Sequence, residues 1–147
     1  MKAILKKAEE WLNRNYHFVL QVEADRRMLT ILENRLASGV SQYENDGTSV
    51  HDPEKSKRKR EDLLLTYSDL KSHVEEEEVK LVEETTLTRK KIEQLSSPEY
   101  IAVATDRYIN RLKWDDISEL EHMSKQKLFL IRVSLLEEMV EILRDVL

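Results

Sequence analysis

The chain has 147 residues, of which 36% are charged and 40% are hydrophobic, and its formal net charge at pH 7 is -5. With only two glycines and two prolines, it has few residues suited to the turns between strands, so the composition predicts an all-α protein. The absence of cysteine excludes disulfides, thiolate metal sites and cysteine nucleophiles, and it favours a reducing compartment.

The amino-terminal segment, residues 1–7, leads directly into a charged amphipathic helix rather than a signal peptide. No apolar run approaches the roughly 20 residues that span a bilayer. We therefore expect a cytoplasmic protein without a membrane partner.

The first predicted helix covers residues 4–36, where apolar residues recur mostly three, four or seven positions apart with charges between them. It should end near Ser38-Gly39, because glycine accepts the left-handed conformation that closes a helix. The following segment, about residues 38–52, has no apolar periodicity and predicts a mobile loop.

A second long helix is predicted from Pro53 to about Leu95, with Asp52 as its cap, and it would be about 60 Å long. We expect it to pair with the first helix as a long antiparallel hairpin over residues 1–96, and residual apolar surface to form a homodimer. Glu77, Glu84 and Thr88 interrupt its heptad-like seam, whose positions are Leu63, Tyr67, Leu70, Val74, Leu81, Thr88, Ile92 and Leu95.

A third start signal, Ser97-Pro98-Glu99, opens a predicted small carboxyl-terminal lobe, residues 97–147. Two short helices and a turn lead there into a longer helix that begins after Ser124, which is the order of a helix-turn-helix. We expect Ile117 and Leu120 to point into the lobe and Met123 to fill the turn.

Lys125, Gln126 and Lys127 would face outward on the first turn of the last helix. Glutamine can bond adenine bidentately, and lysine can reach guanine or phosphate. The alternative is an ordinary helical hairpin with a solvated polar first turn, because the proposed turn has Glu121-His122 in place of the usual glycine.

The motif Arg107-Tyr108-Ile109, followed by residues 112–118 (LKWDDIS) and Met123-Ser124, resembles the signature of the ArpU/RinA-type phage transcription regulators. The resemblance extends over residues 57–139. It implies a helix-turn-helix similar to region four of sigma factors, double-stranded DNA as partner, contact with RNA polymerase as an option, and the cytoplasm of a bacterial host.

In this resemblance Asp116 and Ile117 lie on the first helix of the reading unit, and Ser124 begins the helix that enters the major groove. Residues 129–131 (Phe-Leu-Ile) depart from the pattern and would contact the long helices, a second subunit or polymerase. The candidate DNA-binding residues are Arg111, Lys113, Ser124, Lys125, Gln126 and Lys127.

The densest basic run lies at the start of the second long helix, where the helix dipole is already positive. An anion could compensate there, although such runs are more often solvated faces. Its candidate phosphate contacts are Lys57, Arg58, Lys59 and Arg60.

The sequence supports no catalytic, cofactor or small-molecule site, since it has neither a glycine-rich phosphate loop nor a nucleophile elbow. The four histidines form no pair at helical ligand spacing, so we expect no metal. We therefore expect a DNA-binding regulator and not an enzyme. The alternative is a helical protein that binds or inhibits another protein and does not bind DNA, which the acidic net charge favours.

Overall fold

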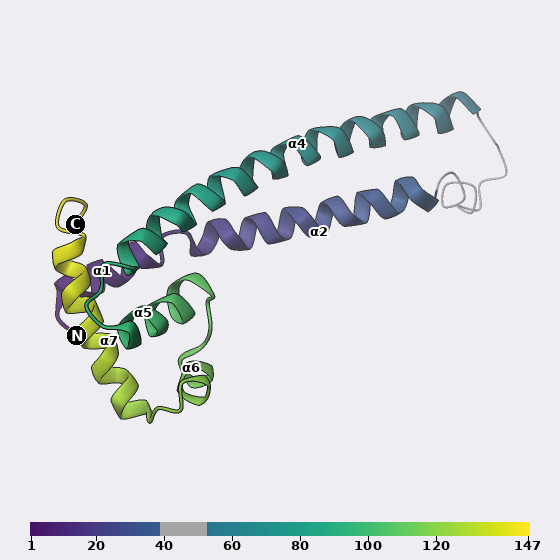
Figure 1. Cartoon of the computed structure of the whole chain (residues 1–147). Coiled ribbons are helices and arrows are strands. Elements are labelled where there is room, and N and C mark those ends of the chain that lie inside the picture. The colour runs from purple at the N-terminus through teal and green to yellow at the C-terminus, as the bar shows by residue number, and fades with distance from the viewer. Residues whose placement is uncertain (39–52) are drawn as a thin grey trace. The chain divides into compact units, whose positions relative to one another are not determined.

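The structure is a computed structural model that describes residues 1–38 and 53–147, and all regular structure in these residues is helical (Figure 1). The prediction of an all-α protein is therefore confirmed for the described residues. The loop predicted over about residues 38–52 lies outside them, apart from Ser38, which is the last residue of a helix. The helical elements are α1 (Ala3–Leu12), α2 (Tyr16–Ser38), α4 (Pro53–Ile92), α5 (Pro98–Ala104), the π-helical segment η1 (Thr105–Ile109), α6 (Trp114–Leu120) and α7 (Lys125–Ile142).

The chain forms two compact units. The arm unit is His17–Leu81, and the core unit joins Met1–Tyr16 to Val82–Leu147. This division differs from the boundary at residue 96 that the sequence predicted. The reason is that Leu5, Ala8 and Leu12 of α1, with Ile92 of α4, are buried in the same hydrophobic core as α5 to α7.

None of the described helices combines the length and the apolar composition that crossing a membrane requires.

The prediction of one continuous helix over residues 4–36 is wrong, because the chain turns between α1 and α2 at residues 13–15. Asn13 leaves the helical region, with φ -93° and ψ 3°, and its carbonyl accepts a hydrogen bond of 2.9 Å from the Tyr16 amide. Asparagine side chains compete with the backbone for such bonds and favour turns, and this segment has two of them, Asn13 and Asn15.

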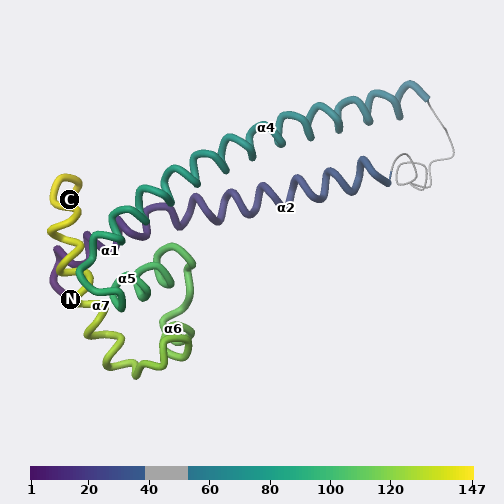
Figure 2. The backbone as a smooth tube through the Cα atoms, in the orientation of Figure 1, coloured from purple at the N-terminus to yellow at the C-terminus, as the bar shows by residue number. Residues whose placement is uncertain are grey.

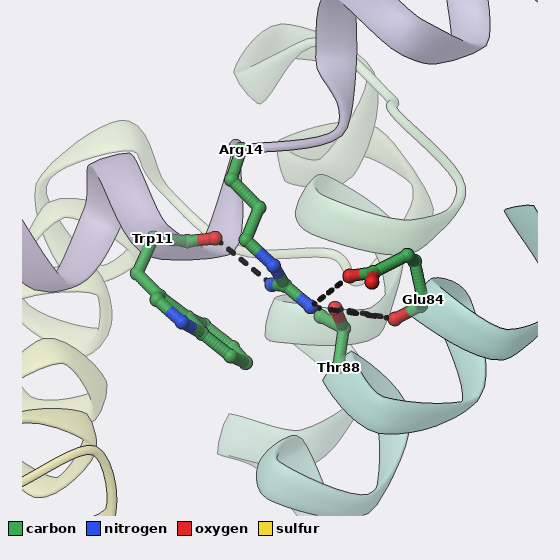
Figure 3. A network of polar contacts seen from close by, with 4 residues as sticks. All are labelled: Trp11, Arg14, Glu84 and Thr88. Carbon is green, nitrogen blue, oxygen red and sulfur yellow. Dashed lines mark hydrogen bonds and ion pairs between the residues drawn. The ribbon is translucent and has the colours of Figure 1, made fainter. Parts of the chain in front are cut away.

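Arg14 fixes this turn against the end of α4 (Figure 3). Its guanidinium donates to the Trp11 carbonyl at 3.0 Å and to a Glu84 carboxylate oxygen at 3.2 Å, and it lies 3.7 Å from the centre of the Trp11 ring. The Glu84 carbonyl also accepts a bond from the Thr88 hydroxyl at 3.0 Å. Glu84 and Thr88, which interrupt the predicted seam, thus have polar partners within the core unit.

In the arm unit, α2 and α4 run side by side in opposite directions (Figure 2). The Arg26 guanidinium donates to Glu78 at 2.8 Å, and the Tyr67 hydroxyl donates to Glu33 at 3.0 Å. As residue numbers rise along α2, those of the partners on α4 fall, which is the order of an antiparallel pair.

The inward face of α4 follows the predicted three-and-four spacing through Leu70, Val74, Glu77 and Leu81. Glu77 is only 7% exposed, so the seam carries a buried carboxyl group where an apolar side chain would pack. Burial raises the pKa of Glu77, as does the neighbouring Asp25 carboxylate, although His73 acts in the opposite direction.

The core unit is centred on α7, whose Leu135, Leu136 and Met139 are inaccessible to solvent. Ile117 of α6 is also fully buried, as predicted. The expectation for Leu120 is wrong, since this side chain is 58% exposed. The helix α6 ends at Leu120, so the chain turns away before this last residue can pack inward.

Glu9 connects α1, η1 and α7 through one carboxylate. The Arg132 guanidinium donates two hydrogen bonds to it, at 2.9 Å and 2.5 Å, and the Tyr108 hydroxyl donates a third at 2.6 Å. Burial alone would raise the pKa of Glu9, but the bonds from Arg132 and Tyr108 and the charges of Arg132 and Arg107 lower it below its ordinary value. Burial and the Glu9 charge raise the pKa of Tyr108, so its hydroxyl stays protonated and remains a donor.

We expect Glu9→Gln to lower the free energy of unfolding by about 2–4 kcal/mol at pH 7, because Arg132 would lose its anionic partner in a largely buried site. The folded-state pKa of Glu9 is lowered, so its stabilisation is present above the ordinary carboxyl value of 4.5 and is lost as the pH falls through the folded-state pKa. The difference between wild type and variant, measured by urea denaturation, should therefore shrink below pH 4.5.

Glu10→Gln is the matched control, since Glu10 is exposed on the same helix and should change stability by less than about 0.5 kcal/mol. Equal losses for the two variants, or a Glu9→Gln deficit that stays constant down to pH 3, would contradict this role of Glu9.

Candidate nucleic-acid interface

The connection between α6 and α7 is a tight turn in which His122 takes the left-handed conformation, with φ 53°. The Met123 amide donates to the Ser118 carbonyl at 2.9 Å, and the His122 amide donates to the Glu119 carbonyl at 3.3 Å. These two bonds form the motif that usually ends a helix at glycine. The sequence lacks a glycine here, and His122 takes its place.

Ser118 and Ser124 hold the two sides of this turn. The Ser118 hydroxyl donates to the Met123 carbonyl at 2.5 Å, and Ser124 caps α7 by accepting a bond of 3.1 Å from the Lys127 amide. The prediction that the last helix begins after Ser124 is confirmed. Leu128, four residues after the cap, is buried in the hydrophobic core and anchors the start of α7 to it.

Ser124, Lys125, Gln126 and Lys127 are all exposed. The two lysines already have acidic partners, because Lys125 Nζ lies 3.3 Å from Asp115 and Lys127 Nζ lies 3.3 Å from Glu99. All four of these charged side chains are well exposed, so each pair is a weak contact in water.

Two further acidic residues lie close together in the core unit, Glu121 in the turn and Asp106 in η1. A hydrogen bond with Asp106 raises the pKa of Glu121, and burial and the negative charges of Asp106 and Glu99 add to the shift. The segment around the start of α7 therefore carries both signs of charge and is not a basic patch.

Arg111 and Lys113 lie in the connection from η1 to α6. Arg111 has a left-handed backbone, with φ 61°, and its guanidinium lies 5.4 Å from the centre of the Tyr16 ring. Lys113 is exposed at the N-cap of α6. Of these two predicted phosphate contacts, Lys113 is the more accessible, since Arg111 is half-buried.

Trp114, at the start of α6, contacts two guanidinium groups. Arg107 lies 5.0 Å and Arg132 lies 5.1 Å from the centre of its ring, and Tyr108 meets it edge-on at 6.4 Å. Trp114 is partly buried and packs against the hydrophobic core. An open pocket of about 210 Å³ adjoins it and is lined by Trp114, Asp115, Lys125, Leu128, Phe129 and Arg132.

Phe129 and Leu130 are exposed on α7, by 53% and 65%. Ile131, the third residue of the apolar run noted in the sequence, is buried in the core. The run therefore divides into one core residue and two surface residues.

The basic run of the second long helix belongs to the arm unit. Lys57, Arg58, Lys59 and Arg60 are exposed on the first turns of α4, and Arg58 lies 3.7 Å from Glu54 one turn before it. They are placed on a different unit from the residues at the start of α7.

The arm unit contains a cluster that the sequence analysis missed, Asp25 of α2 with His73 and Glu77 of α4. One ligand atom from each lies within 4.8 Å of the others, so the three could hold a metal ion. The cluster contains one histidine, so a pair of histidines at helical spacing could not indicate it. The signal in the sequence is His73 and Glu77 four residues apart on one helix face, but Asp25 could not be added without the pairing of α2 and α4.

Comparisons with models of protein families, with curated proteins and with solved structures found no match to this chain.

We expect His122→Gly to raise the free energy of unfolding by about 0.5–1 kcal/mol, because glycine adopts a positive φ without the steric cost that a Cβ atom brings. His122→Val should lower it by at least about 1 kcal/mol, since a branched Cβ suits this conformation worst. Thermal or urea denaturation measures both changes. A loss of stability in the glycine variant would contradict the turn geometry described here.

Proposed function

We propose that the chain is a DNA-binding transcription regulator in which α6, the turn at His122 and α7 act as a helix-turn-helix. The observation that carries the proposal is the start of α7, where a serine cap is followed by the exposed side chains Lys125, Gln126 and Lys127. The buried residues Ile117 and Leu128 support this turn from the core. In helix-turn-helix proteins the residues at the start of the second helix are the ones that contact base edges in the major groove.

Each side chain has a separate role in this proposal. Gln126 is the residue for base readout, because its amide both donates and accepts and can match the edge of adenine. Lys125, Lys127 and Lys113 contact phosphates, with Arg111 beside them, and position the helix without reading sequence.

The acidic partners of the lysines do not prevent this function. An exposed ion pair contributes about 0–1 kcal/mol, so opening the contacts with Asp115 and Glu99 costs little. Each phosphate contact then releases condensed counterions, which favours binding most strongly at low salt. Asp115 and Glu99 lower the affinity for DNA of any sequence, because their negative charges repel the phosphate backbone of any duplex.

The order of motifs in the sequence supports a more specific assignment, a phage-type regulator resembling the ArpU/RinA proteins with a region-four-like reading unit. In this assignment the arm unit dimerises, and its exposed apolar side chains support that role. They include Leu20, Met28 and Ile31 on α2 and Leu64, Leu65 and Val79 on α4. A dimer would present two reading units to two half-sites.

A second candidate function is binding to another protein through α7 without contact to DNA. The exposed Phe129 and Leu130, beside the open pocket at Trp114, favour it. RNA polymerase is one partner compatible with both functions. A gel shift at low salt separates the candidates, since only the first predicts a retarded duplex.

We expect Gln126→Ala to lose about 1–3 kcal/mol of discrimination at one base pair of a selected DNA site. Lys127→Ala should weaken binding to all sequences alike and lower the slope of log K against log salt by about one. Fluorescence anisotropy with selected and random duplexes, at several salt concentrations, measures both effects. If both variants lose equally on specific and random DNA, Gln126 does not read bases.

We expect Asp115→Asn to raise DNA affinity by about threefold to tenfold at low salt, because it removes a repulsive charge and releases Lys125. The gain should shrink as salt rises. Asp69→Asn, which makes the same change of charge on an exposed residue of the arm unit, is the control and should change affinity less. An unchanged or weaker affinity in Asp115→Asn would place the DNA surface away from the start of α7.

A further inference from the structure

Glu77 is the most unusual buried group in the arm unit. It is 93% buried, and neither oxygen of its carboxylate has a hydrogen bond of acceptable geometry in the part of the chain that the structure describes. A buried carboxylate without such partners is strongly unfavourable. A cation bound by Glu77 and the side chains around it would offset this cost.

An apolar residue at position 77 would avoid the cost of burying a carboxylate. Glu77 lies between Val74 and Leu81 on the inward face, where an apolar side chain would stabilise the pairing with α2. Asp25 lies on the inward face of α2, between the buried Val22 and the half-buried Leu29. Two carboxyl groups thus meet in a seam that is otherwise apolar, and they repel each other when both are ionised.

His73 completes a group of three ligands. Its Nε2 atom lies 2.9 Å from Glu77 Oε1 and 3.8 Å from Asp25 Oδ2. Ligand atoms around a four-coordinate zinc ion, with bonds of 2.0–2.2 Å, lie roughly 3.3 Å apart. The observed separations bracket that value, so small side-chain rotations would bring all three atoms to one ion.

We propose that Asp25, His73 and Glu77 bind a divalent transition-metal ion of the zinc class between α2 and α4. One imidazole nitrogen with two carboxylate oxygens suits zinc and its neighbours, whereas calcium and magnesium prefer oxygen alone. The ion offsets the repulsion of the two carboxylates and gives the buried Glu77 carboxylate a ligand bond in addition to its contact with His73. His73 is about half exposed, which gives the ion a route from solvent and leaves room for water as a fourth ligand.

The test is calorimetric titration of zinc chloride into the full chain at pH 7. We expect one ion per chain and a rise in Tm with zinc but not with calcium, because an ion that binds the folded state stabilises it. His73→Ala should lower zinc affinity by at least about tenfold. His122→Asn, which removes an imidazole from the other unit and keeps a residue that tolerates positive φ, should leave affinity unchanged.

Glu77→Gln is a second variant, which keeps the test valid if His73→Ala fails to fold. It removes one of the two facing carboxylates, so without metal its Tm should equal or exceed that of wild type, while its zinc affinity should fall by at least about tenfold. Absence of zinc binding to wild type would overturn the proposal and leave the polar group as a determinant of helix register. Zinc affinity that is unchanged in His73→Ala or Glu77→Gln would overturn it as well, since the ion would then bind elsewhere.

Discussion

The carboxylate of Glu9 is the contact on which the core unit depends, because it joins three segments that are far apart in the sequence. An isolated helix as short as α1 is unstable in water, so α1 must be held by the rest of the unit. Leu5, Ala8 and Leu12 bury apolar surface and so hold α1 against the core. The hydrogen bonds that Glu9 accepts from Arg132 and Tyr108 fix the orientation of α1. Arg132 also lies against Trp114, the first residue of α6. One guanidinium therefore relates α1, α6 and α7 to each other.

This arrangement bears directly on the proposed reading unit. One face of α7 is buried in the core through Leu128, Ile131, Leu135, Leu136 and Met139. The first turn of the helix, the patch at Phe129 and Leu130, and Glu137 and Glu141 further along are exposed. If α7 enters DNA as proposed, a helix start held in this way would need little reordering, which would reduce the entropy lost on binding. The alternating charges around it give weak attraction to any duplex, so affinity would have to come from specific contacts.

Local signals in the sequence predicted much of the fold. Proline after a serine placed the start of α5, the heptad spacing placed the inward face of α4, and Ser124 placed the start of α7. The break at Asn13 was missed because apolar spacing continues across it, and the contact that stabilises the turn, Arg14 with Glu84, is 70 residues away in sequence. Packing between helices also determines two other sets of contacts. These are the ion pairs of the lysines with Asp115 and Glu99, and the cluster at Glu77. Such contacts leave no periodic trace in one sequence.

The π-helical segment η1 has a consequence for how this chain can change in length. Its wider turn, marked by the bond of 2.9 Å from the Asn110 amide to the Thr105 carbonyl, accommodates one residue more than an α-helical turn. Deleting one of the residues 105–107, which precede Tyr108, would allow regular α-helical bonding in this segment. Tyr108 would nevertheless move one position closer to α5 along the chain and would change its place on the helix surface. Tyr108 would then leave the Glu9 carboxylate, so a single-codon deletion here would disturb the whole unit while improving its local helix.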